Sequence, residues 1–124
     1  MRVFDSNILI YHLNDALPPA IKEQIETWIT EGASISVITR IEVLGYPQTA
    51  LQIQLSNRLL SLFDEAALHG EVVQQTIALR QQHRIRLPDA VIAATALTRG
   101  VPLVTRNRSD FRAIAGLMVI DPFA

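Results

Sequence analysis

The segment that most constrains the fold is residues 90–97, which have the composition of a helix that is apolar or small on nearly every face. A helix of this kind has no side suited to water, so we expect it to be buried, most favourably against a sheet. Pro88 marks its start and Gly100 its end, as is typical of the first helical turn and of the position after the last one. We therefore expect this helix to lie in the core and to be covered by a sheet.

Short apolar segments of strand length alternate with segments of helical spacing, and no linker, repeat or low-complexity tract interrupts them. The predicted strands are residues 2–4, 34–37, 63–68, 102–105 and 117–120, and the predicted helices are 7–13, 20–30, 39–46, 51–62, 70–83 and 89–97. Such alternation predicts βαβ units. We therefore expect an α/β fold, a three-layer α/β/α sandwich with a central, mainly parallel sheet of about five strands, in one domain over residues 1–124.

The composition excludes several classes of protein. Apolar residues make up 49% of the chain, too many for a disordered protein. The absence of cysteine excludes disulfides, thiolate zinc sites and cysteine nucleophiles, and it suits a cytoplasmic protein. The N-terminus lacks the apolar run of a signal peptide, and no uncharged apolar stretch approaches the roughly 18 to 20 residues that span a membrane. We therefore expect a cytoplasmic protein with no membrane partner.

The basic residues are almost all arginines and are concentrated in one part of the chain. Ten of the eleven are arginine, and seven of these lie in residues 80–112, where Asp89 and Asp110 are the only acids. Arginine binds phosphate through paired hydrogen bonds and stacks on bases. A solvated helix face has the same pattern, and with a net charge of −1 the charges alone favour that interpretation.

Four acidic residues lie at the ends of predicted elements. Asp5 ends the first strand, Glu42 lies about one turn into the helix after the second strand, and Asp110 follows the fourth strand. Asp89 opens the buried helix, and a right-handed crossover would bring it to the same edge of the sheet. Functional sites of open α/β sheets gather at this carboxyl edge. We therefore expect the four carboxylates to converge.

Converging carboxylates repel one another unless a cation lies between them. Mg²⁺ and Mn²⁺ prefer hard oxygen ligands, and such an ion can activate water and stabilise charge on a phosphoryl group. Carboxylates, a divalent ion and nearby arginines together favour hydrolysis of phosphodiesters. Other catalytic motifs are missing, since His12, His69 and His83 lack metal-ligand spacing and no Gly-x-Ser-x-Gly elbow or Walker loop is present.

Each acid also has a structural interpretation. Asp5 and Asp89 can cap the helices that follow them, and Asp110 can be a turn or cap residue. Glu42 is harder to explain in this way, because apolar residues surround it and a carboxylate on a largely buried helix needs a partner. The four acids therefore support a functional site as a set rather than one by one.

Polar and basic residues beside the acids complete the predicted site. Thr39 precedes Glu42 by one helical turn, which places the two side chains on one face. Arg106 and Arg108 are the arginines best placed to contact a phosphate backbone. The residues expected to support the carboxylates, each of which can equally be an ordinary cap, are Ser6, Asn7, Thr39, Thr105 and Asn107.

Four segments resemble the PIN domains, and within them the VapC-like toxins of type II toxin–antitoxin modules. The segments are VFDSNILI (3–10), SVITRIEVLG (36–45), LPDAVIAATA (87–96) and LVTRNRSDF (103–111), in the order of the family and across nearly the whole chain. The resemblance implies a PIN-like fold and a hydrolase that uses Mg²⁺ or Mn²⁺ to cut RNA. It also implies a homodimer and a cognate antitoxin protein that covers the active site.

Carried onto this chain, the resemblance implies that Asp5, Glu42 and Asp89 are the three core acids. Relatives vary at the fourth acid, and here the resemblance assigns Asp110, with Asn107 as a supporting ligand. We therefore predict that these four acids are catalytic and bind one or two metal ions, while Arg106 and Arg108 contact RNA phosphates.

The alternative is a non-catalytic PIN-like module that binds RNA or protein. Apolar side chains of residues 20–30 and 51–62 suit a dimer or antitoxin surface, although packing in the core is the commoner explanation for such residues.

Overall fold

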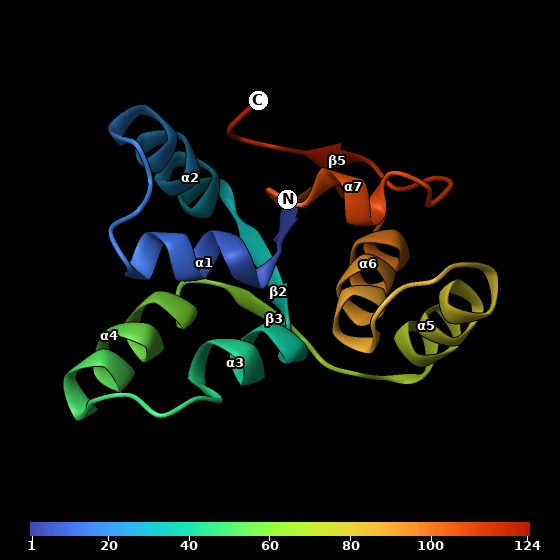
Figure 1. The fold of residues 1–124 in the computed structure, drawn as a ribbon, viewed down its shortest axis with the longest axis horizontal. Helices are drawn as coiled ribbons and strands as arrows, with labels where there is room; N and C mark the ends of the chain where they lie inside the picture. Colours follow the sequence, from blue (N-terminus) through green and yellow to red (C-terminus); the bar gives the residue numbers. More distant parts are fainter.

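A computed structural model describes residues 1–124 and contains one sheet flanked by helices (Figure 1). The sheet has five strands in the order β3-β2-β1-β4-β5, and every neighbouring pair is parallel. The elements, in chain order, are β1 (Arg2–Phe4), α1 (Ser6–Leu13), α2 (Pro19–Glu31), β2 (Ala33–Ser36), α3 (Val37–Leu44), α4 (Ala50–Leu60), β3 (Asp64–Ala66), α5 (Gly70–Gln82), α6 (Leu87–Arg99), β4 (Leu103–Val104), α7 (Arg108–Phe111) and β5 (Val119–Ile120). The predicted parallel sheet is confirmed.

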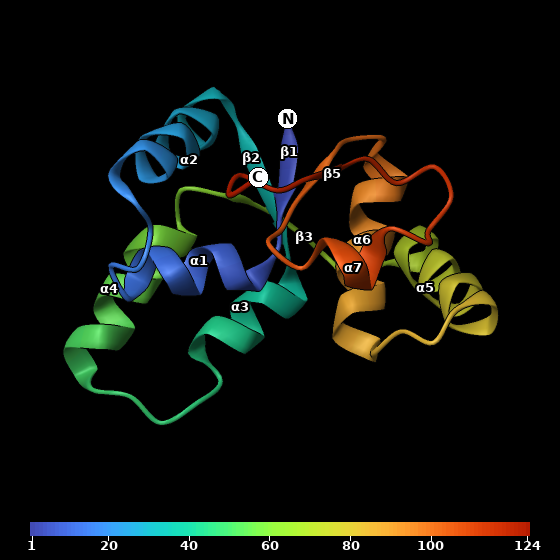
Figure 2. The same ribbon diagram turned by 45° about the horizontal axis from the view of Figure 1, so that its top comes forward.

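β1 is the central strand, and its residues face opposite sides in turn, with the ordinary period of a strand. Val3 is fully buried in a core that includes residues of α5 and α6, whereas Phe4 is fully buried in a core that includes residues of α1, α2 and α4. Both ribbon views show α1 to α4 on one side of the sheet and α5 to α7 on the other (Figures 1 and 2). The predicted three-layer sandwich is therefore confirmed.

α6 is the buried helix that the sequence predicts. Every residue from Asp89 to Ala96 is buried, and the helix packs against α5 and the strands β1 and β2. Its end is set by Gly100, whose φ of 65° lies in the left-handed region that favours glycine. Pro88 lies in the first turn, as expected.

Besides shifts of one or two residues at the ends of several elements, three differences from the prediction stand out. The segment after β4 forms the short helix α7, which is too short to give a periodic pattern in the sequence. β3 is confined to Asp64–Ala66 at the edge of the sheet, where two of its three side chains are exposed. α3 is less buried than expected, because Ile41 is 59% exposed. Separately, no helix has both the length and the apolar character that crossing a membrane requires.

Candidate active site

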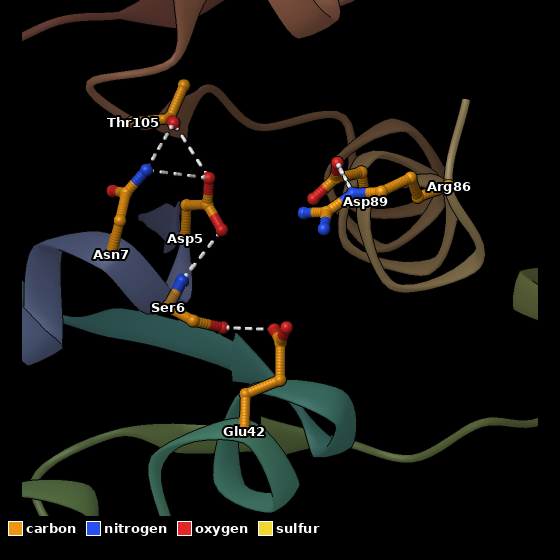
Figure 3. Close-up of polar contacts among 7 residues, drawn as sticks. All are labelled: Asp5, Ser6, Asn7, Glu42, Arg86, Asp89 and Thr105. Carbon is orange, nitrogen blue, oxygen red and sulfur yellow. Dashed lines mark hydrogen bonds and ion pairs between the residues drawn. The ribbon is translucent and has the colours of Figure 1, made fainter. Parts of the chain in front are cut away.

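Asp5 lies where β1 ends and α1 begins, at the carboxyl edge of the sheet (Figure 3). It is the N-cap residue of α1, and its Oδ1 accepts a hydrogen bond from the Ser6 backbone N–H at 2.7 Å. Its Oδ2 accepts from the Thr105 hydroxyl at 2.7 Å and from Nδ2 of Asn7 at 3.3 Å. Asp5 therefore caps a helix and, through its other oxygen, faces polar groups at the edge of the sheet.

The carboxyl group of Asp5 is difficult to ionise in this position. Its pKa is raised from 3.8 to about 6, chiefly by burial and then by the negative charges of Asp89 and Glu42, against the lowering effect of hydrogen bonds from Thr105 and Ser6. Asp5 is only 5% exposed, so little water screens these charges. A site that penalises its own negative charge in this way favours a bound cation.

Glu42 reaches the site from α3. Its Oε1 accepts a hydrogen bond from the Ser6 hydroxyl at 2.6 Å, and the same hydroxyl lies 3.1 Å from the hydroxyl of Thr39. Ser6 and Thr39 are buried, and Glu42 is half-buried. Ser6 is therefore the partner that a carboxylate in this position requires. Because Ser6 directly follows Asp5, its hydroxyl also connects α3 to the start of α1.

Asp89 faces the same space from the first turn of α6. Its Oδ2 accepts a hydrogen bond from Nε of Arg86 at 3.3 Å. Arg86, not Asp89, is the N-cap residue of α6, so the interpretation of Asp89 as a helix cap is wrong. Figure 3 shows Asp5, Glu42 and Asp89 on different sides of one region, each from a different part of the fold. The prediction missed this role of Arg86, although a spacing of three residues at a helix start is a signal for such a pair.

Asp110 lines one cavity, of about 340 Å³, together with Asp89. It lies in α7 and is exposed. The other residues that line this cavity are His83, Arg84, Ile85, Arg86, Ser109, Ala113 and Ile114. The structure therefore brings Asp110 to the side of Asp89, whereas Asp5 does not line the cavity.

Thr105 is fully buried and connects the end of β4 to Asp5. Its hydroxyl accepts hydrogen bonds from the backbone N–H of Asn107 at 3.0 Å and from Nδ2 of Asn7 at 3.4 Å. Asn107 thus supports the site through its backbone, and its side chain is exposed. The role of that side chain as a ligand stays a prediction.

The arginines of residues 80–112 do not form one patch. The guanidinium carbon of Arg106 lies 4.3 Å from the ring centre of Phe123 and 5.2 Å from that of Tyr11, while Arg108 is exposed. A second hollow, of about 520 Å³, shares four of its lining residues with the cavity of Asp89 and Asp110. The residues that line this second hollow are Arg80, His83, Arg84, Ile85 and Arg86. The basic surface nearest the acids therefore comes from the end of α5 and the loop before α6.

No three histidine, cysteine or acidic side chains lie close enough together to bind a metal ion as they stand. Instead, Asp5, Glu42 and Asp89 each accept a hydrogen bond from a neighbouring hydroxyl or guanidinium group. The donor set itself fits a hard divalent ion, because it consists of carboxylate, hydroxyl and amide oxygens. Asn7 Oδ1 is buried without a partner, so rotation of this amide would present a further oxygen beside Asp5.

Known proteins are similar to this chain over almost its full length. The PIN domain model matches residues 2–117. A chain from a toxin–antitoxin complex of Klebsiella pneumoniae is 33% identical, with a TM-score of 0.82 and 98% of each chain covered. No curated protein matches the chain by sequence.

Two further structures show the fold. VapBC2 from Rickettsia felis, bound to a DNA fragment from its promoter, has a TM-score of 0.83 at 22% identity, with 96% of each chain covered. VapBC-1 from nontypeable Haemophilus influenzae has a TM-score of 0.82 at 23% identity, with 99% of this chain and 98% of the other covered. The resemblance to the PIN domains and their VapC-like members is therefore confirmed, and the protein belongs to the PIN domain family.

Proposed function

We propose that the protein is a ribonuclease that depends on Mg²⁺ or Mn²⁺ and hydrolyses RNA phosphodiester bonds. The observation that carries the proposal is the position of Asp5, buried at the carboxyl edge of the sheet with its pKa raised by burial and by the charges of Asp89 and Glu42. Such a group destabilises the fold when it is ionised, so a functional role explains its presence better than a structural one. Membership of the PIN domain family supports the same conclusion.

The proposed ligands of the ion are the carboxylates of Asp5, Glu42, Asp89 and Asp110. A divalent ion bound there supplies an activated water and stabilises the charge that develops on the phosphoryl group. Thr105 holds one oxygen of Asp5, and Ser6 holds one oxygen of Glu42, each through a hydrogen bond. These two hydroxyls therefore orient the carboxylates, which lowers the cost of ordering them around an ion.

We propose further that the protein is the toxin of a toxin–antitoxin pair, acting in the cytoplasm as a homodimer that a cognate antitoxin inhibits. The support is the 33% identical chain from Klebsiella pneumoniae, which belongs to a toxin–antitoxin complex. An apolar surface on α4 suits a protein partner, since Leu55 is 45% exposed and Leu62, just beyond the helix, is 59% exposed. We expect expression of the protein to arrest growth, and normal growth would refute the toxin role. We expect light scattering to show a dimer, and a strict monomer at micromolar concentration would refute the homodimer.

A non-catalytic PIN-like module that binds RNA or protein is the second candidate. The separation of the acids favours it, because no three of them are close enough to bind an ion without moving. Calorimetry separates the two candidates, since the nuclease is expected to bind Mn²⁺ or Mg²⁺. Absence of binding at millimolar concentration would support the module.

The activity is tested by incubating the purified protein with single-stranded RNA. We expect cleavage with Mg²⁺ or Mn²⁺, no cleavage with EDTA, and no cleavage by Asp5→Asn, whose circular dichroism should match the wild type. The matched control is Asp15→Asn, because Asp15 is exposed in the turn after α1 and its φ of 53° suits asparagine. Wild-type cleavage by Asp5→Asn would show that the site is wrongly assigned.

A further inference from the structure

We propose that Arg86 has two alternative partners: it pairs with Asp89 while no metal is bound, and it contacts an RNA phosphate once an ion has taken Asp89. This inference rests on the proposed ribonuclease function and adds to it a substrate-binding residue. Without metal, Arg86 would balance the negative charge of Asp89, which lies near the other acids. It would become available to bind RNA only after a metal ion has bound.

The first observation is the position of Arg86 between an acidic and a basic region. It is the N-cap residue of α6, three positions before Asp89. Its side chain lines both the cavity of Asp89 and Asp110 and the hollow that Arg80, His83 and Arg84 help to form. A side chain at this junction can reach either region by rotating about its own bonds, with no movement of the backbone.

The second observation is the weakness of the contact with Asp89. Arg86 donates to Asp89 through Nε alone, at 3.3 Å, and its side chain is 76% exposed. By comparison, Arg99 lies 2.6 Å from Asp64, and the Arg40–Glu65 pair has two hydrogen bonds. A single, long and exposed ion pair contributes little free energy, so a competing ligand of Asp89 can displace Arg86.

The third observation is the electrostatic field at Arg86. Arg86 Nε lies 3.3 Å from Oδ2 of Asp89, and Arg86 lines the same cavity as Asp89 and Asp110. The guanidinium is therefore held by the charges of the acids proposed to bind the ion. A divalent cation among these acids would replace this attraction with repulsion, which favours rotation of Arg86 toward the basic hollow. Arginine there is suited to a phosphate of the RNA backbone.

The test compares Arg86→Gln with Arg112→Gln, because Arg112 is also exposed in the arginine-rich region but lines neither the cavity nor the hollow. Calorimetry with Mn²⁺ alone gives the first readout. We expect Arg86→Gln to bind Mn²⁺ about two- to fivefold more tightly than the wild type, the range that loss of an exposed ion pair allows. Arg112→Gln should bind Mn²⁺ as the wild type does, and thermal unfolding should show both variants folded.

The second readout is the salt dependence of binding to labelled single-stranded RNA, measured with Ca²⁺ and with EDTA on samples checked for intact RNA. With Ca²⁺, Arg86→Gln should reduce the slope of log affinity against log salt by about 0.7, the value for one lost phosphate contact. With EDTA the slope should stay unchanged, because Arg86 then pairs with Asp89. Arg86→Lys, which retains the charge, should restore most of the slope.

The outcomes separate this inference from the function on which it rests. If the wild type binds Mn²⁺ and cuts RNA but Arg86→Gln binds Mn²⁺ more weakly, Arg86 holds Asp89 in place for the ion and the inference is wrong. It is also wrong if Arg86→Gln and Arg112→Gln give the same slopes with Ca²⁺. If the wild type neither binds Mn²⁺ nor cuts RNA, the proposed ribonuclease function itself fails.

Discussion

Replacing Asp5 with asparagine is expected to stabilise the metal-free protein at neutral pH, although it should abolish the proposed activity. The pKa of Asp5 is raised from 3.8 to about 6 in the folded protein, first by burial and then by Asp89 and Glu42. The folded state therefore binds this proton more tightly than the unfolded state does. The resulting stability is fully present below pH 3.8 and is lost as the pH rises through about 6.

The magnitude follows from the size of the shift. At about 1.36 kcal/mol per pKa unit, ionised Asp5 costs the folded state about 3 kcal/mol at pH 8. Asparagine has nearly the same shape and carries no charge, but its nitrogen replaces one oxygen that accepts hydrogen bonds from Ser6 or from Thr105 and Asn7. That loss costs about 1 kcal/mol. Asp5→Asn should therefore be about 2 kcal/mol more stable than the wild type at pH 8 without metal.

Urea unfolding in EDTA at several pH values measures this difference. The stability advantage of Asp5→Asn should grow by about 1.4 kcal/mol between pH 5 and pH 8, because ionisation of Asp5 continues over that range in the folded state. Other titrating groups are common to both proteins and largely cancel. Saturating Mn²⁺ should reverse the order, since it would stabilise the wild type and bind the variant poorly. A difference that does not change with pH, or a variant less stable than the wild type at pH 8 in EDTA, would refute the reasoning.

Three further predictions concern the surroundings of the site. Ser6→Ala removes the hydrogen bond to Glu42 and should cost about 1 kcal/mol of stability; it should also lower kcat, and unchanged kcat in RNA cleavage assays would contradict the orienting role. Mn²⁺ or Mg²⁺ at a hundred times its Kd should stabilise the wild type by about 2.7 kcal/mol, measured by thermal unfolding. EDTA should reverse this gain in stability, and Asp5→Asn should not show it. Gly100→Ala should lower the free energy of unfolding by about 1 kcal/mol, because φ is 65° at this position. The cleavage rate per folded molecule should stay at the wild-type level. An unfolding midpoint in urea equal to that of the wild type would contradict the predicted loss of stability.

The central features of the fold could be predicted from local patterns. The helix around residues 90–97 and the alternation of strands and helices determine the buried α6 and the parallel sheet. The helix α7 could not be predicted in the same way, because four residues give no periodicity and its position depends on packing of Phe111 into the core. The exposure of Ile41 is equally a tertiary property, since it depends on which face of α3 other helices cover.

The polar residues beside the acids could also be predicted, but which of them bonds to which carboxylate could not, and the pairing of Arg86 with Asp89 was missed. The negative charges of Asp89 and Glu42 both raise the pKa of Asp5. The contact of Thr105 with Asp5 joins residues 100 positions apart, and only the sheet topology brings them together. Arg106 is predicted to contact phosphate because it is close to Asp110 in sequence. In the structure its guanidinium instead packs over the rings of Tyr11 and Phe123, which the sequence does not reveal.

The pairing of β1 with β4 has a consequence for the synthesis of the protein. Asp5 leaves the ribosome before its hydrogen-bond donor Thr105, which follows 100 residues later together with the neighbouring strand β4. A nascent chain that has produced α1 to α5 therefore has the first acid but lacks the strand that fixes it. The proposed site would thus be completed only after β4 has left the ribosome and paired with β1.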